Sequence, residues 1–253
     1  MNMSLDHVVH YVNDVPGAVE TFKQEGIHAV MGGSHKQWGT HNGLAYFNLS
    51  YIEWLGIEDE SSLKQAYGQN PVFQDAGVLL PESPVLHKFA IRTSHIEQVC
   101  QSLEEKGIRT SGVLANSRQD RKGRSIRWKM LILENSPEQM PYPFFIEWEE
   151  SDCERLKKLK ESGVIPERAS HDIRISELVF HTSSPADVKD EWASLFGIQV
   201  EDDEVNTLNI DGVRLVFRKG IQNRLTSVIL EGKLLDDKRI KIEGSEYKLV
   251  SSC

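Results

Sequence analysis

The feature that most constrains the fold is a unit that occurs three times along the chain. Each copy is a strand-like run rich in β-branched and aromatic residues, followed by a helix-like run and a Gly-Ile pair. In the first copy the strand covers residues 5–12, Asp14 and Pro16 signal a helix start, and Gly26 ends the helix. The strands and helices of the other two copies lie at residues 86–93 and 96–106, and at residues 175–182 and 185–195. Residues 15–27 and 96–108 match without a gap, so the chain contains a duplicated folding unit.

Strand-like segments follow each helix. They cover residues 44–48 and 51–57, then 125–133 and 144–149, then 207–210 and 213–218. The last pair flanks Asp211-Gly212, a strong signal for a tight hairpin. Each repeat therefore predicts a βαβββ module, whose small sheet has an apolar face that it cannot bury alone. Two such modules side by side form a curved eight-stranded sheet, and its concave side can hold a ligand.

The predicted fold class is α+β, with two paired modules and a third, degenerate one. Residues 1–150 form the first domain, with modules at about 1–82 and 83–150. Residues 59–84 and 151–171 read as linkers, and the second of them holds a short solvated helix within 151–170. Residues 171–253 form the third module, with extra strands at 225–231, 238–243 and 247–250.

The composition limits the classes of binding partner that we expect. The net charge is −9, with 38 acidic and 29 basic residues, so we expect neither nucleic acid nor an anionic membrane as a partner. No apolar run approaches the ~18 residues of a spanning helix, and the first residues do not resemble a signal peptide. Three widely spaced cysteines argue against a disulfide framework. We therefore expect a cytoplasmic protein that binds a small molecule.

Three residues are the first candidates for chemistry. His7 lies in the first strand, and Glu53 and Glu147 lie in Ile-Glu-Trp triplets in the last strands of the first two modules. A carboxylate among apolar residues costs free energy unless it is paired or binds a cation. One histidine with two glutamates is also a known style of divalent-metal site. The alternative is that both glutamates face water, because side chains alternate along a strand.

Two further segments could contact a ligand. In the glycine-rich segment 32–42, the polar and aromatic candidates are His35, Trp38, Thr40, His41 and Asn42. The alternative is a rigid turn packed by Trp38. In the basic run 118–127, Arg118 and Arg121 could clamp a carboxylate or phosphate, with Trp128 nearby, or be solvated in a turn. His10, Tyr11 and His181 are expected to be packing residues.

The chain resembles the glyoxalase-like group of the vicinal-oxygen-chelate superfamily over about residues 3–150. The resemblance rests on Leu5-Asp6-His7, the glycine-rich segment, Tyr51-Ile52-Glu53, the run 121–128 and the run 143–148. It implies a metal ligand on the first strand and another on the last strand of each module. His7, Glu53 and Glu147 match that pattern. Gapless alignment of the helices puts Lys88 at the fourth position, and a one-residue bulge would bring His87 there instead.

The resemblance leaves three functions open. One is an enzyme of lyase, isomerase or dioxygenase type, in which Mn, Fe, Ni or Zn chelates vicinal oxygens and Glu53 or Glu147 acts as a base. Another is a metal-free binding or sequestration protein, favoured if Lys88 replaces a ligand. The third is a structural role in which the third module covers a sheet edge or makes a homodimer contact.

Overall fold

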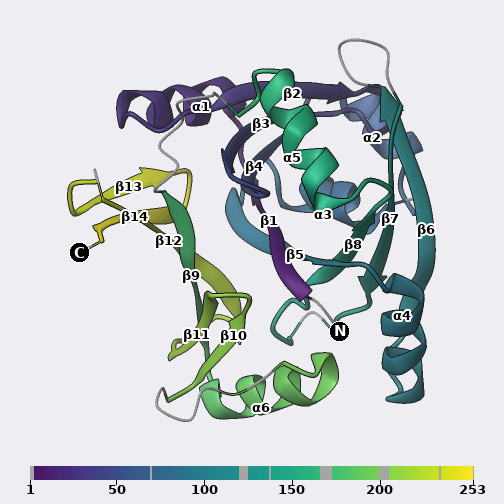
Figure 1. Cartoon of the computed structure of the whole chain (residues 1–253). Coiled ribbons are helices and arrows are strands. Elements are labelled where there is room, and N and C mark those ends of the chain that lie inside the picture. The colour runs from purple at the N-terminus through teal and green to yellow at the C-terminus, as the bar shows by residue number, and fades with distance from the viewer. Residues whose placement is uncertain are drawn as a thin grey trace. The chain divides into compact units, whose positions relative to one another are not determined.

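The computed structural model describes residues 3–68, 70–119, 125–136, 138–165, 173–198, 200, 205–233 and 235–252. These residues form fourteen strands, six α-helices and one short 3-10 helix (Figure 1). The strands are β1 Met3–Tyr11, β2 Val30–His35, β3 Thr40–Phe47, β4 Ser50–Ile57, β5 Val85–Thr93, β6 Thr110–Gln119, β7 Ser125–Leu133, β8 Phe144–Trp148, β9 Arg174–Thr182, β10 Thr207–Ile210, β11 Val213–Lys219, β12 Arg224–Gly232, β13 Lys238–Ile242 and β14 Ser245–Ser251. The helices are α1 Val15–Gln24, η1 Lys36–Trp38, α2 Glu60–Gln65, α3 Pro71–Leu79, α4 Ile96–Glu105, α5 Asp152–Glu161 and α6 Pro185–Phe196.

The repeated strand and helix of the sequence are confirmed in all three copies. Helices α1, α4 and α6 each follow a strand of nine residues, β1, β5 and β9. The Asp14 side chain caps α1 by accepting a hydrogen bond from the Gly17 backbone N–H. Gly26, Gly107 and Gly197 follow the three helices with φ between 66° and 80°, the left-handed conformation that ends a helix.

The first two modules have the same topology, which confirms the α+β class of tandem βαβββ modules. In the first, the strand order is β2-β3-β4-β1, with β1 parallel to β4 and the other neighbours antiparallel. In the second, the order is β6-β7-β8-β5, with β5 parallel to β8. Each module thus places its first strand beside its last one.

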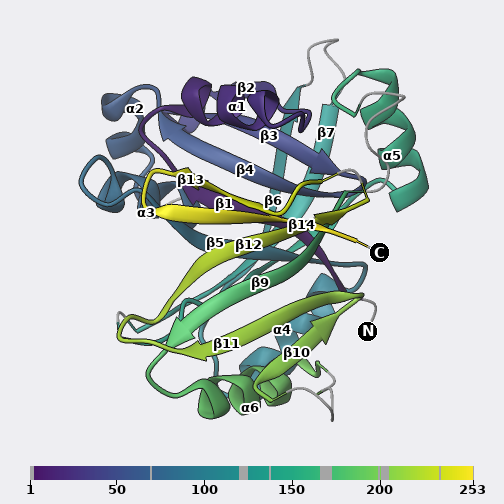
Figure 2. The same ribbon diagram turned by 90° about the vertical axis from the view of Figure 1, so that its left-hand side faces the viewer.

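The C-terminal strands form two further modules of reduced size. β9 is parallel to β11 and β10 is antiparallel to β11, with α6 between β9 and β10, so the third module lacks only one strand of the full pattern among the described residues. β12 is parallel to β14, and β13 is antiparallel to β14 (Figure 2). Among the described residues, the extra strands predicted after the third module thus pair as a unit that contains no helix, which we call the fourth module. Asp211 and Gly212 have φ values of 50° and 82°, which confirms the predicted tight turn.

The chain divides into two compact units. One contains residues 1–6, 88–156 and 176–225, and hence most of the second and third modules. The other contains residues 7–87, 157–175 and 226–253, and hence most of the first and fourth modules. Each unit thus combines one of the first two modules with one of the last two.

In the unit of the first and fourth modules, α1 covers one face of the sheet. Figure 2 shows α1 lying over β3 and β4, where Phe22 meets the Trp54 ring edge-on with ring centroids 4.7 Å apart. Tyr247, from β14, lies against the same Phe22 ring at 5.0 Å. The described residues of the fourth module include no helix, and its fully buried Tyr247 packs against the helix of the first module.

A directed chain of hydrogen bonds crosses this core. The Trp54 indole N–H donates to the Tyr247 hydroxyl oxygen at 3.1 Å, and that hydroxyl lies 2.7 Å from His10 Nδ1. His10 Nε2 lies 3.2 Å from the Glu243 carbonyl oxygen, which can only accept, so Nε2 carries the proton and Nδ1 accepts from Tyr247. His10 is fully buried, and this burial lowers its pKa from 6.5 to about 4.

This neutral His10 predicts a loss of stability in mild acid. Because its pKa is lower in the folded chain, the unfolded chain takes up a proton first as the pH falls below 6.5. The contribution is fully present above that pH, and about 3 kcal/mol of unfolding free energy is lost as the pH falls from 6.5 to 4. Urea unfolding at several pH values checks it. His10→Asn keeps an acceptor for Tyr247, and we expect it to lose the fall in unfolding free energy between pH 6.5 and pH 4 that His10 causes. The same dependence of unfolding free energy on pH in both proteins would contradict the assignment.

The other unit buries an aromatic core and a charged cluster. Phe89, Phe180, Trp192 and Phe217 are all buried, with ring centroids between 5.3 and 5.8 Å apart in the contacting pairs. In the cluster, the fully buried carboxylate of Asp6 accepts a hydrogen bond from the Trp148 indole N–H at 2.8 Å. Two guanidinium groups also lie near this carboxylate, with N···O distances of 3.4 Å for Arg92 and 3.5 Å for Arg155.

The two predicted linkers contain more structure than their composition indicates. Residues 59–84 form α2 and α3, which begin at side-chain caps from Asp59 and Asn70. The helix predicted within 151–170 exists as α5, but it is not wholly solvated. Arg155 is buried, and its guanidinium carbon lies 4.1 Å from the centroid of the Trp148 ring.

Candidate functional site

The strand register gives the first module two distinct faces. His10 pairs with Trp54, and Trp54 with Gly43, and these residues point toward α1. Side chains alternate along a strand, so His7, Tyr51 and Glu53 point to the opposite face, which we call the open face.

His7 and Glu53 form a polar pair on the open face of the first module. His7 Nε2 lies 3.7 Å from Glu53 Oε2, and their side chains are only 6% and 13% exposed. The His7 ring stacks on Tyr51 with centroids 4.5 Å apart, and Tyr51 stacks on Tyr46 at 4.6 Å. The Tyr51 ring thus stacks on the imidazole while a small part of the Glu53 side chain reaches water, as a site for a small polar ligand requires.

Asn42 holds the second oxygen of Glu53. The Asn42 Nδ2 group donates to Glu53 Oε1 at 2.6 Å. The Asn42 Oδ1 atom accepts from the backbone N–H of Gly33 at 2.9 Å. Asn42, predicted to contact a ligand, therefore contacts the acidic candidate directly.

The rest of the glycine-rich segment is a packed turn. Trp38 is buried and stacks on Phe73 of α3 with centroids 4.4 Å apart. His35 Nδ1 lies 3.0 Å from the buried Thr40 hydroxyl. This arrangement matches the alternative that the sequence left open, a rigid turn packed by Trp38. A contact of His35, Trp38, Thr40 or His41 with a ligand stays a prediction. His41 pairs with Gly56 and lies on the α1 face, away from His7 and Glu53.

His87 lies at the α3 end of this unit. Its Nε2 atom is 3.4 Å from Asp75 Oδ2 of α3, and its ring lies 5.4 Å from that of Tyr11. The Tyr11 hydroxyl donates to the Val72 carbonyl, also in α3. Burial raises the pKa of Tyr11 well above its usual range, and the charges of Asp75 and Glu53 raise it further. Tyr11 and His10 are thus buried packing residues, as predicted.

The register of the second module does not make the two Ile-Glu-Trp triplets equivalent. The gapless helix alignment makes Ala90 the counterpart of Val9. Val9 pairs with Glu53, and Ala90 pairs with Phe144, so the counterpart of Glu53 is Phe144. The same alignment makes Lys88, which is buried, the counterpart of His7.

Glu147 instead lies on the α4 face of the second module. Its Oε2 atom accepts a hydrogen bond from the backbone N–H of Ile96, the first residue of α4, at 2.9 Å. Its Oε1 atom lies 3.7 Å from Nζ of Lys129, which also pairs with Glu97. A carboxylate at a helix N-terminus stabilises the helix. Glu147 is therefore placed as a cap of α4.

The face of the second module opposite α4, which we call its open face, carries two of the predicted ligand-contacting residues. Asn116 pairs with Trp128, Arg118 lies two residues further along β6, and Trp128 pairs with Trp148 at 5.7 Å between ring centroids. Arg118 is exposed and Trp128 is partly exposed. Arg121 lies outside the described residues. The contact of Arg118 and Trp128 with a ligand stays a prediction.

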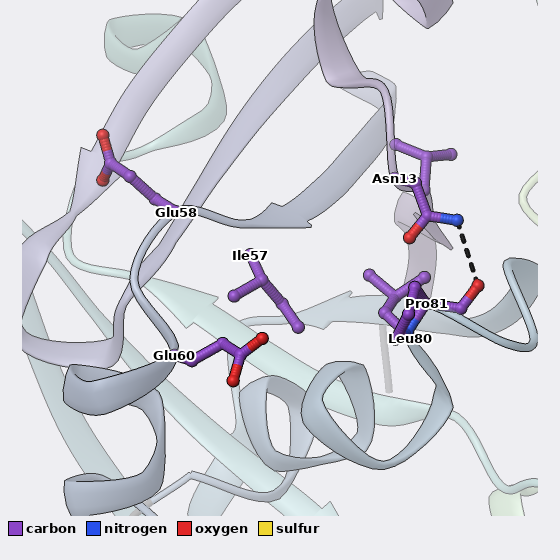
Figure 3. Close-up of a pocket in the computed structure, with 7 residues that line it drawn as sticks. Asn13, Ile57, Glu58, Glu60, Leu80 and Pro81 are labelled. Atoms are coloured by element: carbon purple, nitrogen blue, oxygen red, sulfur yellow. Dashed lines mark hydrogen bonds between the residues drawn. The ribbon is translucent and has the colours of Figure 1, made fainter.

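The described part of the chain also has a shallow pocket away from the His7–Glu53 pair. Among the described residues, no three His, Cys, Asp or Glu side chains gather closely enough to hold a metal ion. A shallow pocket of about 280 Å³ lies between Val12, Ile57 and the turn at Leu80-Pro81 (Figure 3). It is lined by Glu58 and Glu60 and contains none of the predicted site residues. No helix in the described part of the chain has the length and apolar character needed to cross a membrane.

Comparisons with known proteins show the family to which the chain belongs. The family model described as "Glyoxalase-like domain" matches residues 5–196. A hypothetical protein from Staphylococcus aureus shares the fold, with a TM-score of 0.84 and 24% identity over 99% of this chain and 100% of that chain.

Two methylmalonyl-CoA epimerases have lower similarity. The Mycobacterium tuberculosis enzyme has a TM-score of 0.40 and 21% identity, over 58% of this chain and 88% of that chain. A Streptomyces coelicolor variant bound to 2-nitronate-propionyl-CoA has a TM-score of 0.44 and 16% identity, over 59% and 100%. The comparison with curated proteins found no match. On the match over residues 5–196, the chain belongs to the glyoxalase-like domain family.

Proposed function

We propose that the chain binds a small, oxygen-containing molecule at the His7–Glu53 pair, and that this pair works without a metal ion held by four side chains. The observation that carries the proposal is the strand register. The repeat makes Lys88 the counterpart of His7 and Phe144 the counterpart of Glu53. His7 and Glu53 offer metal ligands, whereas Lys88 and Phe144 do not.

The donor groups fit a divalent metal poorly. A protein-bound zinc ion takes three or four side-chain ligands, and the family pattern supplies two from each module. An ammonium has no lone pair for a metal, and a phenyl ring offers none either. Within the unit of the first and fourth modules, His7 Nε2 lies 3.7 Å from the Glu53 carboxylate, while His87 pairs with Asp75. The residues present therefore do not make the expected metal centre.

The pair can still move a proton. Glu53 is largely buried, and its two oxygens face an amide donor and an imidazole. A carboxylate in such surroundings can accept a proton from a carbon or hydroxyl group of a bound molecule, and His7 can stabilise the charge that forms. The predicted lyase or isomerase chemistry with Mn, Fe, Ni or Zn is the competing proposal. Cytoplasmic location and a homodimer stay predictions.

Metal analysis of the full chain tests the proposal. After expression with added Mn, Fe, Ni or Zn, we expect clearly less than one bound ion per chain. The reason is that two ligands hold a divalent ion too weakly to survive purification. One ion per chain in the native protein, lost in both His7→Ala and Glu53→Ala, contradicts the proposal.

Matched glutamate variants test the binding site itself. Oxalate, pyruvate and catechol serve as probes with vicinal oxygens, and binding is followed by calorimetry or by NMR shifts. We expect Glu53→Gln to change the affinity for any probe that binds, because it removes the charge at the proposed site. Glu147→Gln makes the same change in the same triplet, and it should leave affinity unchanged while costing about 0.5–2 kcal/mol of stability through the α4 cap. Equal effects of both variants on affinity would contradict the assignment of Glu53.

A further inference from the structure

The strongest unassigned feature of the open face is the amide of Asn42. Asn42 is buried, and both of its polar atoms have partners of fixed character. The Gly33 backbone N–H can only donate, and it points at Asn42 Oδ1 over 2.9 Å. The Glu53 carboxylate accepts hydrogen bonds, and its Oε1 atom lies 2.6 Å from Asn42 Nδ2.

These partners determine the orientation of the amide. A flipped amide would set its NH₂ group against the Gly33 N–H and its oxygen against a carboxylate oxygen. Two donors and two acceptors would then face each other in a buried place. The backbone also closes around the amide oxygen, because a Cβ placed on Gly32 would lie 2.0 Å from Oδ1. Glycine at position 32 is what lets Oδ1 sit there.

We propose that Asn42 is a positioning residue that orients Glu53 at this centre and offers a donor where an acidic residue would offer a metal ligand. Its NH₂ group holds Glu53 Oε1 and leaves Oε2 directed toward His7. Its own oxygen accepts from the Gly33 backbone N–H, which fixes the amide. This inference rests on the proposed function and explains how the pair is held.

The substitution Asn42→Asp tests it, because aspartate has the same shape and offers an oxygen where the NH₂ group was. His7, Glu53 and the new carboxylate would then provide three ligands, a number found in protein zinc sites. We expect the Zn²⁺ dissociation constant of the full chain to fall by about 10-fold or more relative to the native chain. Asn116→Asp is the matched control, since it adds the same charge to the open face of the second module. Equal Zn²⁺ affinity of the two variants overturns the inference.

The native chain offers a second readout that does not depend on the variant's folding. The side-chain amide protons of Asn42 are identified by NMR from the signals lost in Asn42→Ser. We expect one of them to be shifted downfield and to exchange slowly, because it bonds to a carboxylate. That signal should move in Glu53→Gln and stay in place in Glu147→Gln. Asn42 amide signals whose chemical shifts do not change in Glu53→Gln would overturn the inference. A metal ion bound to the native chain would instead overturn the proposed function.

Discussion

Replacing Asp6 with asparagine is expected to lower the unfolding free energy by about 3–5 kcal/mol, because it removes the buried anion that lies beside two guanidinium groups. Asp6 is fully buried, and the side chains of Arg92 and Arg155 are only 12% and 6% exposed. The same carboxylate oxygen also accepts the Trp148 indole N–H, so one substitution weakens three contacts. Urea unfolding at pH 7 measures the loss.

An exposed ion pair provides the control for the Asp6 prediction. Arg127 and Glu149 are about 60% exposed and 3.2 Å apart, so Glu149→Gln should change stability by less than about 1 kcal/mol. If the unfolding free energy of Asp6→Asn is as close to that of the native protein as the value for Glu149→Gln, the buried cluster does not stabilise this unit.

Tyr247→Ala is expected to cost about 3–5 kcal/mol, since it opens a cavity in the other core. Tyr247 is fully buried, and its ring meets those of Phe22 and Trp54. Tyr247→Phe separates the contribution of the hydroxyl group to stability from that of the ring. It keeps the packing but leaves the Trp54 N–H and His10 Nδ1 without their partner, so about 1–3 kcal/mol should be lost.

The fourth module supplies Tyr247, so this pair of variants also tests its role in the first module's core. Thermal and urea unfolding should show one transition that shifts in both variants. Tyr67→Ala is a control at a tyrosine that is 42% exposed. A native-like midpoint for Tyr247→Ala, or a second transition confined to the C-terminal strands, would contradict the packing described for this unit.

The repeated strands and helices could be predicted from the sequence because their cues are local. Helical spacing of apolar residues, the cap at Asp14 and glycines such as Gly26 and Gly107 act within one turn of chain. The Asp211-Gly212 hairpin is of the same kind. The sequence did not predict helices α2 and α3, because apolar residues in segment 59–84 lack clear helical spacing. Asp59 and Asn70, which cap the two helices, are residue types that indicate a helix start.

The candidate site was only partly predictable, because a strand's register decides which face a side chain takes. His7 and Glu53 do lie together, and their positions on the first and last strands indicated this. The two Ile-Glu-Trp triplets look alike in sequence, yet they differ by three positions in the register, an odd number that turns Glu147 to the α4 face. The role of Asn42 depends on a hairpin contact across eleven residues, which no local pattern reveals.

Anomalous diffraction from crystals of the full chain grown with Zn²⁺ tests the central claim most directly. The account predicts the Asn42 amide beside Glu53 Oε1 and no anomalous peak bonded to His7 and Glu53. A strong peak at about 2.0–2.2 Å from both His7 Nε2 and a Glu53 oxygen would contradict it.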